Sequence, residues 1–67
     1  MYCALDFFKE NTMRFPKSSN AWDSLGEAYL LDNQKEKALK NYQKALSLNP
    51  NARVKASAEK GLKELTS

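Results

Sequence analysis

The chain has 67 residues, enough for one small domain whose core can only just sustain itself. Apolar residues make up 42% and charged residues 28%, as in ordinary globular proteins, and no apolar run reaches the roughly 18 residues that would span a bilayer. The net charge of +3 is too small and dispersed to favour nucleic acid, and the absence of histidine removes the commonest metal ligand and general base.

The first predicted helix covers residues 3–15. Apolar side chains recur along it at helical spacing, and Pro16 ends it because proline cannot continue a helix. Cys3 lies on the apolar side, and we interpret it as a small core residue, since a lone cysteine has no partner for a disulfide within the chain.

The second predicted helix begins near Asn20, with Ser18 or Ser19 as its N-cap, and runs to about Leu31. Polar turn residues follow it. A third helix covers roughly 35–48 and ends before Asn49 and Pro50. A fourth covers about 52–65, with Asn51 as its predicted N-cap and an apolar stripe along one face.

An internal repeat links the first and third helices. Ala38, Tyr42 and Pro50 each have a counterpart of the same type 34 residues earlier, at Ala4, Phe8 and Pro16. Thirty-four residues is the period of the tetratricopeptide repeat, a pair of antiparallel helices.

The residues between these positions strengthen the match, and the chain resembles the tetratricopeptide family. The resemblance implies an all-α fold of four helices in antiparallel helix-turn-helix pairs, an α-solenoid fragment forming a single domain over 1–67. It divides the chain into a half repeat (3–18), a full repeat (19–52) and a C-terminal capping helix (53–66) whose outer face is polar. The signature comprises Trp22, Leu25, Gly26, Tyr29, Ala38, Tyr42, Ala45 and Pro50.

Helix geometry gives this signature a packing role. Gly26 shares an arc with Trp22 and Tyr29, and its missing side chain lets a neighbouring helix approach closely. Ala38 and Ala45 let the third helix lie against the second, while the ring of Tyr42 is predicted to wedge into the gap toward the next helix. These aromatic residues therefore indicate a core and no cofactor site.

We expect no catalytic, cofactor-binding or metal-binding residues in this chain. Ser24 and Ser57 have no histidine to activate them, and the two glycines do not form a phosphate-binding loop. Asp23 and Glu27, four residues apart, are predicted to be like charges on a surface, and the lysines of the third helix a solvated outer face.

The face of the second helix opposite its core arc is the candidate partner groove. In the tetratricopeptide family the corresponding positions bind peptide segments. Two acidic side chains in this set favour a basic or mixed apolar-basic protein or peptide partner. The alternative is that these residues only face solvent. The candidate groove residues are Asn20, Asp23, Glu27, Leu30 and Leu31.

The half repeat lacks its first helix, so its apolar stripe has no natural partner. Repeats of this kind are stabilised mainly by their neighbours. Either a longer polypeptide supplies the missing helix or another copy of this chain does. For the isolated chain we expect self-association, most simply as a closed dimer. The candidate self-association residues are Leu5, Phe8, Thr12 and Phe15.

A second resemblance concerns residues 15–29, which look like C-terminal tails of bacterial serine hydrolases related to β-lactamases. It implies an alternative function: a structural appendage of a larger enzyme whose active site lies upstream. Because residues 1–6 lack the features of a secretion signal, the chain as given is expected in the cytoplasm, and a periplasmic location follows only from the hydrolase reading.

Overall fold

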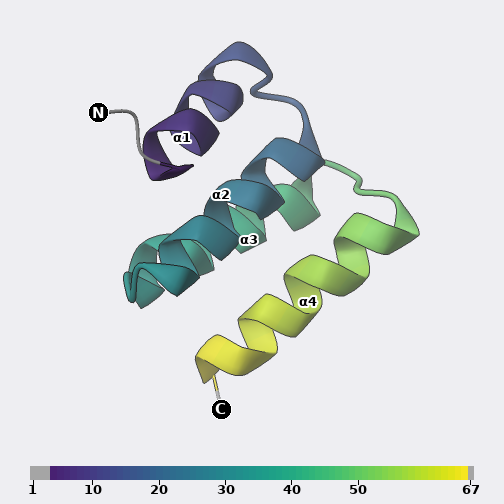
Figure 1. Cartoon of the computed structure of the whole chain (residues 1–67). Coiled ribbons are helices and arrows are strands. Elements are labelled where there is room, and N and C mark those ends of the chain that lie inside the picture. The colour runs from purple at the N-terminus through teal and green to yellow at the C-terminus, as the bar shows by residue number, and fades with distance from the viewer. Residues whose placement is uncertain (1–3, 67) are drawn as a thin grey trace.

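The computed structural model describes residues 4–66, which form four α-helices. These are α1 (Ala4–Arg14), α2 (Ser19–Leu31), α3 (Lys35–Ser47) and α4 (Ala52–Thr66). Consecutive helices run antiparallel and pack side by side, and α4 also contacts α2 (Figure 1). The predicted all-α architecture of four antiparallel helices is confirmed. Cys3, predicted to be a core residue, lies outside the described residues.

Side-chain caps fix the starts of two helices. The hydroxyl of Ser18 accepts a hydrogen bond from the backbone N–H of Ala21 at 3.3 Å, so α2 begins at Ser19. Asn51 accepts a hydrogen bond from the N–H of Val54 at 2.9 Å, as its position before α4 predicted. The N-cap of α3, Gln34, makes no such bond.

Asparagines turn the chain after α2 and α3. Asn33 and Asn49 have φ angles of 62° and 54°, in the left-handed region that asparagine tolerates better than most residues. The N–H of Asn33 bonds to the carbonyl of Leu30, and that of Gln34 to the carbonyl of Tyr29. These bonds satisfy carbonyl groups that the end of α2 would otherwise leave without partners.

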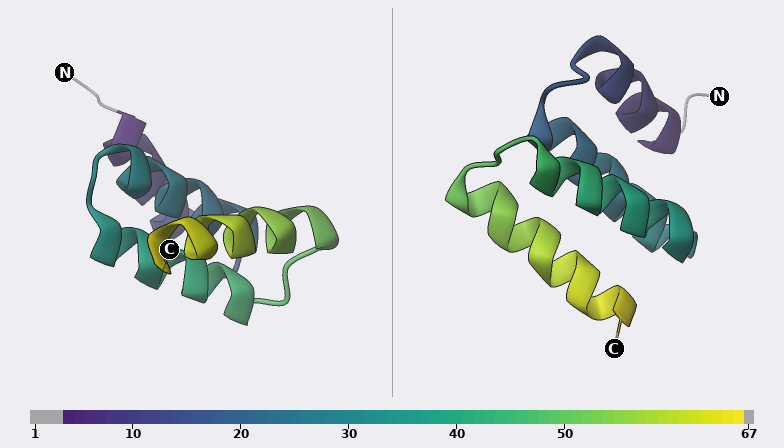
Figure 2. Two further views of the ribbon diagram at one scale, coloured as in Figure 1. Left: turned by 90° about the horizontal axis from the view of Figure 1, so that it is seen from below. Right: turned by 180° about the vertical axis from the view of Figure 1, so that it is seen from behind.

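The core lies where α2, α3 and α4 meet. Seen from behind, α3 lies in front of α2, with α1 on one side of this pair and α4 on the other (Figure 2). The small side chains of Ala38 and Ala45 are fully buried and let α3 lie close to α2. The buried cluster comprises Leu25, Tyr29, Ala38, Tyr42, Ala45 and Ala58.

Tyr42 is the central side chain of this core. Its ring is 3% exposed and lies against glycines of two helices. A β-carbon built at Gly26 of α2 would lie 3.0 Å from its Cδ1, and one built at Gly61 of α4 would overlap its Cζ. The ring therefore occupies space on both helices that only glycine leaves free.

Two residues expected on open surfaces are buried instead. Thr12 was predicted to take part in self-association, but its side of α1 is covered and its hydroxyl donates to the carbonyl of Lys9 at 2.7 Å. Asp23 was predicted to point away from the core. It is only 7% exposed because α4 packs against that flank of α2.

Candidate functional site

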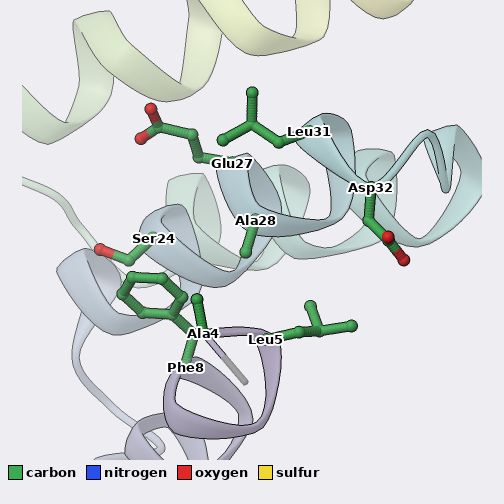
Figure 3. Close-up of a pocket in the computed structure, with 8 residues that line it drawn as sticks. All are labelled: Ala4, Leu5, Phe8, Ser24, Glu27, Ala28, Leu31 and Asp32. Atoms are coloured by element: carbon green, nitrogen blue, oxygen red, sulfur yellow. The ribbon is translucent and has the colours of Figure 1, made fainter.

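An apolar pocket of about 570 Å³ opens between α1 and α2. Side chains of α1 point into it from one side, and Ser24 and Ala28 of α2 point toward α1 from the other (Figure 3). Glu27 and Asp32 also line the pocket, but the Glu27 carboxylate points away from α1, toward α4 (Figure 3). Its lining is Ala4, Leu5, Phe8, Ser24, Glu27, Ala28, Leu31 and Asp32.

A smaller hollow of about 240 Å³ lies between α2 and α4. We call it the α2–α4 groove. It combines apolar side chains with charged groups from both helices, and Tyr42 lies at its base. Its lining is Glu27, Leu30, Leu31, Tyr42, Ser57, Lys60, Gly61 and Glu64. Glu27 and Leu31 thus border both hollows, on opposite sides of α2.

Asp23 is a buried acid at the contact between α2 and α4. Its carboxylate accepts a hydrogen bond from the Ser57 hydroxyl, while its Oδ1 is buried without a partner among the described residues. Burial raises the pKa of the Asp23 carboxyl above its ordinary value of 3.8, and the charge of Glu27 raises it further against the opposing effect of the Ser57 bond. Ionised Asp23 is therefore a costly group to keep in this position.

The phenol of Tyr42 shares this acidic environment. Burial, followed by the nearby charges of Asp23, Glu27 and Glu64, raises the pKa of Tyr42 to about 12. The ring therefore stays neutral at any physiological pH and acts as a packing residue.

The residues of the candidate partner groove separate into three environments. Glu27, Leu30 and Leu31 line the α2–α4 groove, with Leu31 83% exposed. Asn20 is exposed at the start of α2 and lines neither hollow. Asp23 is buried and cannot contact a partner directly.

The candidate self-association residues also lie in different environments. Leu5 and Phe8 are half-buried, pack against the core and line the α1–α2 pocket. Phe15 is 59% exposed beyond the end of α1. Thr12 is buried and contributes nothing to an open surface.

The signature residues lie at the core or beside it. Leu25, Gly26 and Tyr29 are buried on α2. Trp22 is half-buried, and its indole N–H donates to the carbonyl of Pro16 at 2.8 Å, which holds the loop after α1 against α2. Pro50 is half-buried in the loop before α4.

The ammonium groups of three lysines lie over two of these aromatic rings. The ammonium groups of Lys9 and Lys37 lie 5.8 and 5.7 Å from the ring centre of Tyr29, and that of Lys44 lies 5.9 Å from the centre of Trp22. Two of the lysines predicted to form a solvated face on α3 thus also stabilise the packing of α2.

Gly61 and Ser57 are important residues that the sequence reasoning missed. Both lie on α4 and contact the core through Tyr42 and Asp23. One signal was available: Gly61 is one of only two glycines in the chain, and it lies in the middle of a predicted helix, where glycine is costly.

None of the helices within residues 4–66 is both long and apolar enough to cross a membrane. Among the same residues, no three histidine, cysteine, aspartate or glutamate side chains come together in a way that could hold a metal ion.

Comparison with known proteins found relatives that share part of the chain. It is 51% identical over 37 residues to superkiller complex protein 3 of Mus musculus and to tetratricopeptide repeat protein 37 of Xenopus laevis, a match that covers 55% of the chain. Human superkiller complex protein 3 is 54% identical over 35 residues, or 52% of the chain. The chain spans about 2% of the length of each of these relatives.

No solved structure matched the chain. None of the three relatives is described as a serine hydrolase, and all are vertebrate proteins, so the resemblance to bacterial hydrolase tails has no support. The model of the tetratricopeptide repeat matches residues 19–52, which is half of the sequence. Together with the antiparallel helices and the buried signature residues, this match shows that the chain belongs to the tetratricopeptide repeat family.

Proposed function

We propose that the chain is a non-catalytic scaffold that binds a segment of another protein in the α2–α4 groove. Repeats of this family generally act in protein–protein interaction. Superkiller complex protein 3 is, by its name, a component of a complex, which agrees with such a role. The observation that carries the proposal is the mixed lining of the groove, where half-buried Leu30 and exposed Leu31 lie next to carboxylates.

The lining favours a partner segment with both apolar and basic residues. Leu30 and Leu31 offer apolar surface from α2. Glu27 and Glu64 face the hollow from its two sides, and their combined field attracts a lysine or arginine side chain. Lys60, on the α4 side, repels a segment that is basic throughout. The groove therefore favours a segment that combines apolar and basic residues.

Selection from a library of random 12-residue peptides tests this proposal. We expect bound peptides to be enriched in lysine or arginine next to leucine or isoleucine. Glu64→Lys should weaken their binding by about fivefold at low salt, because rim charges of this kind contribute about 1 kcal/mol. Glu36→Lys, on the exposed start of α3, makes the same charge change away from the groove and serves as the control. Enrichment of acidic peptides, or equal losses in both variants, would contradict the proposal.

Self-association through α1 is a second candidate, and exposed apolar side chains favour it. Phe7, Met13 and Phe15 are 50%, 80% and 59% exposed along one helix and its following loop. We expect light scattering at micromolar concentration to detect a dimer that Phe8→Asp weakens more than Lys40→Asp does. A monomer that melts cooperatively would rule this candidate out.

A further inference from the structure

The buried carboxylate of Asp23 lies directly behind the wall of the α2–α4 groove. Asp23 of α2 and Ser57 of α4 are 34 residues apart, so they hold equivalent positions on two helices that run in the same direction. The Ser57 hydroxyl donates to the Asp23 carboxylate, and Ser57 itself lines the groove. Asp23 is 7% exposed, whereas Ser57 is exposed. A buried charge is thus separated by one hydroxyl from the surface that a partner would contact.

This hydrogen bond determines what Ser57 can offer to a partner. A hydroxyl has one proton to donate and two lone pairs that accept. Because the proton of Ser57 is directed at Asp23, only the lone pairs of its oxygen remain for a group in the groove. The negative charge of Asp23 makes that oxygen a stronger acceptor. Ser57 therefore favours a partner group that donates a hydrogen bond.

Two further carboxylates border the same hollow. Glu27 of α2 and Glu64 of α4 line it, and the Glu27 carboxylate points toward α4 (Figure 3). Their charges and that of Asp23 all act on the phenol of Tyr42 at the base of the groove. Independently of these surface groups, the buried Oδ1 of Asp23 has no hydrogen-bond partner among the described residues. The hollow therefore presents acceptors and negative charge from both helices to a single cation.

We propose that Asp23, acting through Ser57, makes this end of the α2–α4 groove a receptor for an arginine side chain of the partner. The inference rests on the proposed function of the groove. Arginine suits the site better than lysine, because its planar guanidinium directs five donors at acceptors on two helices, whereas an ammonium is a point charge. Asp23 is a positioning residue, since it reaches the partner only through Ser57.

The groove also has a direction. Along α4 its lining begins at Ser57 and ends at Glu64, and along α2 it begins at Glu27 and ends at Leu31. The serine end and the leucine end are therefore about 10 Å apart, at a rise of about 1.5 Å per residue. An extended segment covers this distance in about three residues. The partner therefore carries its arginine about three residues from a leucine or isoleucine.

Binding of this arginine should depend on the protonation of Asp23. Burial raises the pKa of the Asp23 carboxyl above its ordinary value of 3.8. The cation favours ionised Asp23, so affinity is complete above the raised pKa and falls as the pH drops through it. The other charged or titratable groups at this place are Glu27 of α2, Tyr42 of α3, and Lys60 and Glu64 of α4. Asp23→Asn leaves all of them unchanged and so isolates the contribution of Asp23.

Matched peptides test the role of Asp23. The probes are the tightest-binding peptide of the random library, synthesised with arginine, lysine or citrulline at its basic position. Calorimetric titration at pH 7 and low salt should show arginine binding about fivefold more tightly than lysine, and neutral citrulline more weakly than either. Asp23→Asn should weaken the arginine peptide by about fivefold while it raises the melting temperature. Asp32→Asn, the same change outside the groove, should leave the affinity unchanged.

Variants of Ser57 separate its hydrogen bond from the general field of the groove. Ser57→Ala should weaken the arginine peptide as much as Asp23→Asn does, and the double variant should lose no more than either single one. Ser57→Thr keeps a hydroxyl and should bind as the parent does. On acidification the affinity of the parent should begin to fall at a higher pH than that of Asp23→Asn.

The outcomes distinguish this inference from the function on which it rests. If Glu64→Lys weakens binding but Asp23→Asn and Ser57→Ala do not, the groove binds peptides and Asp23 has no role in it. Equal affinity of the arginine and lysine peptides would overturn the assignment of arginine. A library that yields no apolar-basic peptide would overturn the groove as a binding site, and this inference with it.

Discussion

Gly61 occupies a position in α4 where the core leaves no room for a methyl group. A β-carbon there would lie 2.9 Å from Cε1 of Tyr42 and overlap Cζ and Cε2. Tyr42 cannot easily move aside, because the same ring also lies against Gly26 of α2. Packing around one ring therefore outweighs the intrinsic preference of a helix for alanine.

Gly61→Ala should destabilise the chain by up to about 2 kcal/mol, because overpacking of about 1–3 kcal/mol outweighs the gain of about 1 kcal/mol in helix propensity. Urea denaturation followed by circular dichroism measures this. Gly26→Ala is the matched comparison and should cost less, since its β-carbon would approach Tyr42 no closer than 3.0 Å. A Gly61→Ala variant as stable as the parent would show that the ring adapts.

The burial of Asp23 predicts that the stability of the chain falls as the pH rises. The folded state raises its pKa, so the folded chain binds this proton more tightly than the unfolded chain. The stabilisation that protonated Asp23 gives is complete below the ordinary pKa of 3.8 and is lost as the pH rises through the higher folded value.

Asp23→Asn should therefore stabilise the chain at pH 7 by about 1 kcal/mol, because it removes an ionised group with a buried oxygen that lacks a partner. The difference from the parent should shrink as the pH falls toward 3.8. Thermal melts between pH 3 and 8 measure both variants. An Asn variant less stable than the parent at pH 7 would contradict this reading of Asp23.

At the scale of the helix, the stability of α4 should depend more on its N-cap residue than the stability of α3 does. Asn51→Ala should cost about 1 kcal/mol, because it removes the acceptor for the Val54 N–H. Gln34→Ala should cost much less, because Gln34 makes no cap bond to α3. Equal losses in denaturant melts of the two variants would mean that the Asn51 bond contributes little.

The helices were predictable from the sequence to within one or two residues, because their ends depend on local features. Pro16 and Asn51 act within a single turn, and the periodicity of apolar residues identifies the inner face of each helix. The 34-residue offset also placed Tyr42 between neighbouring helices.

Which helix packs against each helix face was harder to predict. Periodicity gives the direction of Asp23 around α2, but not the presence of a second helix on that flank, so its burial against α4 was missed. Gly61 was missed because its counterpart 34 residues earlier is Glu27, which breaks the repeat. The positions that break the 34-residue repeat, such as Glu27 and Gly61, are therefore those whose surroundings were hardest to predict from the sequence.

At the scale of the whole molecule, α1 is the least supported helix. It contacts only α2 among the described helices, while α3 packs between α2 and α4. We expect amide hydrogens of α1 to exchange faster than those of α3 by about tenfold or more, because local opening of α1 breaks fewer contacts. Hydrogen exchange measured by NMR tests this. Uniform protection across the four helices would show that they open only together.

Tyr42 has a geometric consequence beyond stability. Because its ring lies against both Gly26 and Gly61, its size limits how closely α4 can approach α2. In an array of such units, the same spacing recurs at every step, and a small change in one side chain is multiplied along its length. A smaller side chain at this position would let successive helices pack closer together. The size of this one residue would therefore affect the curvature of a long array.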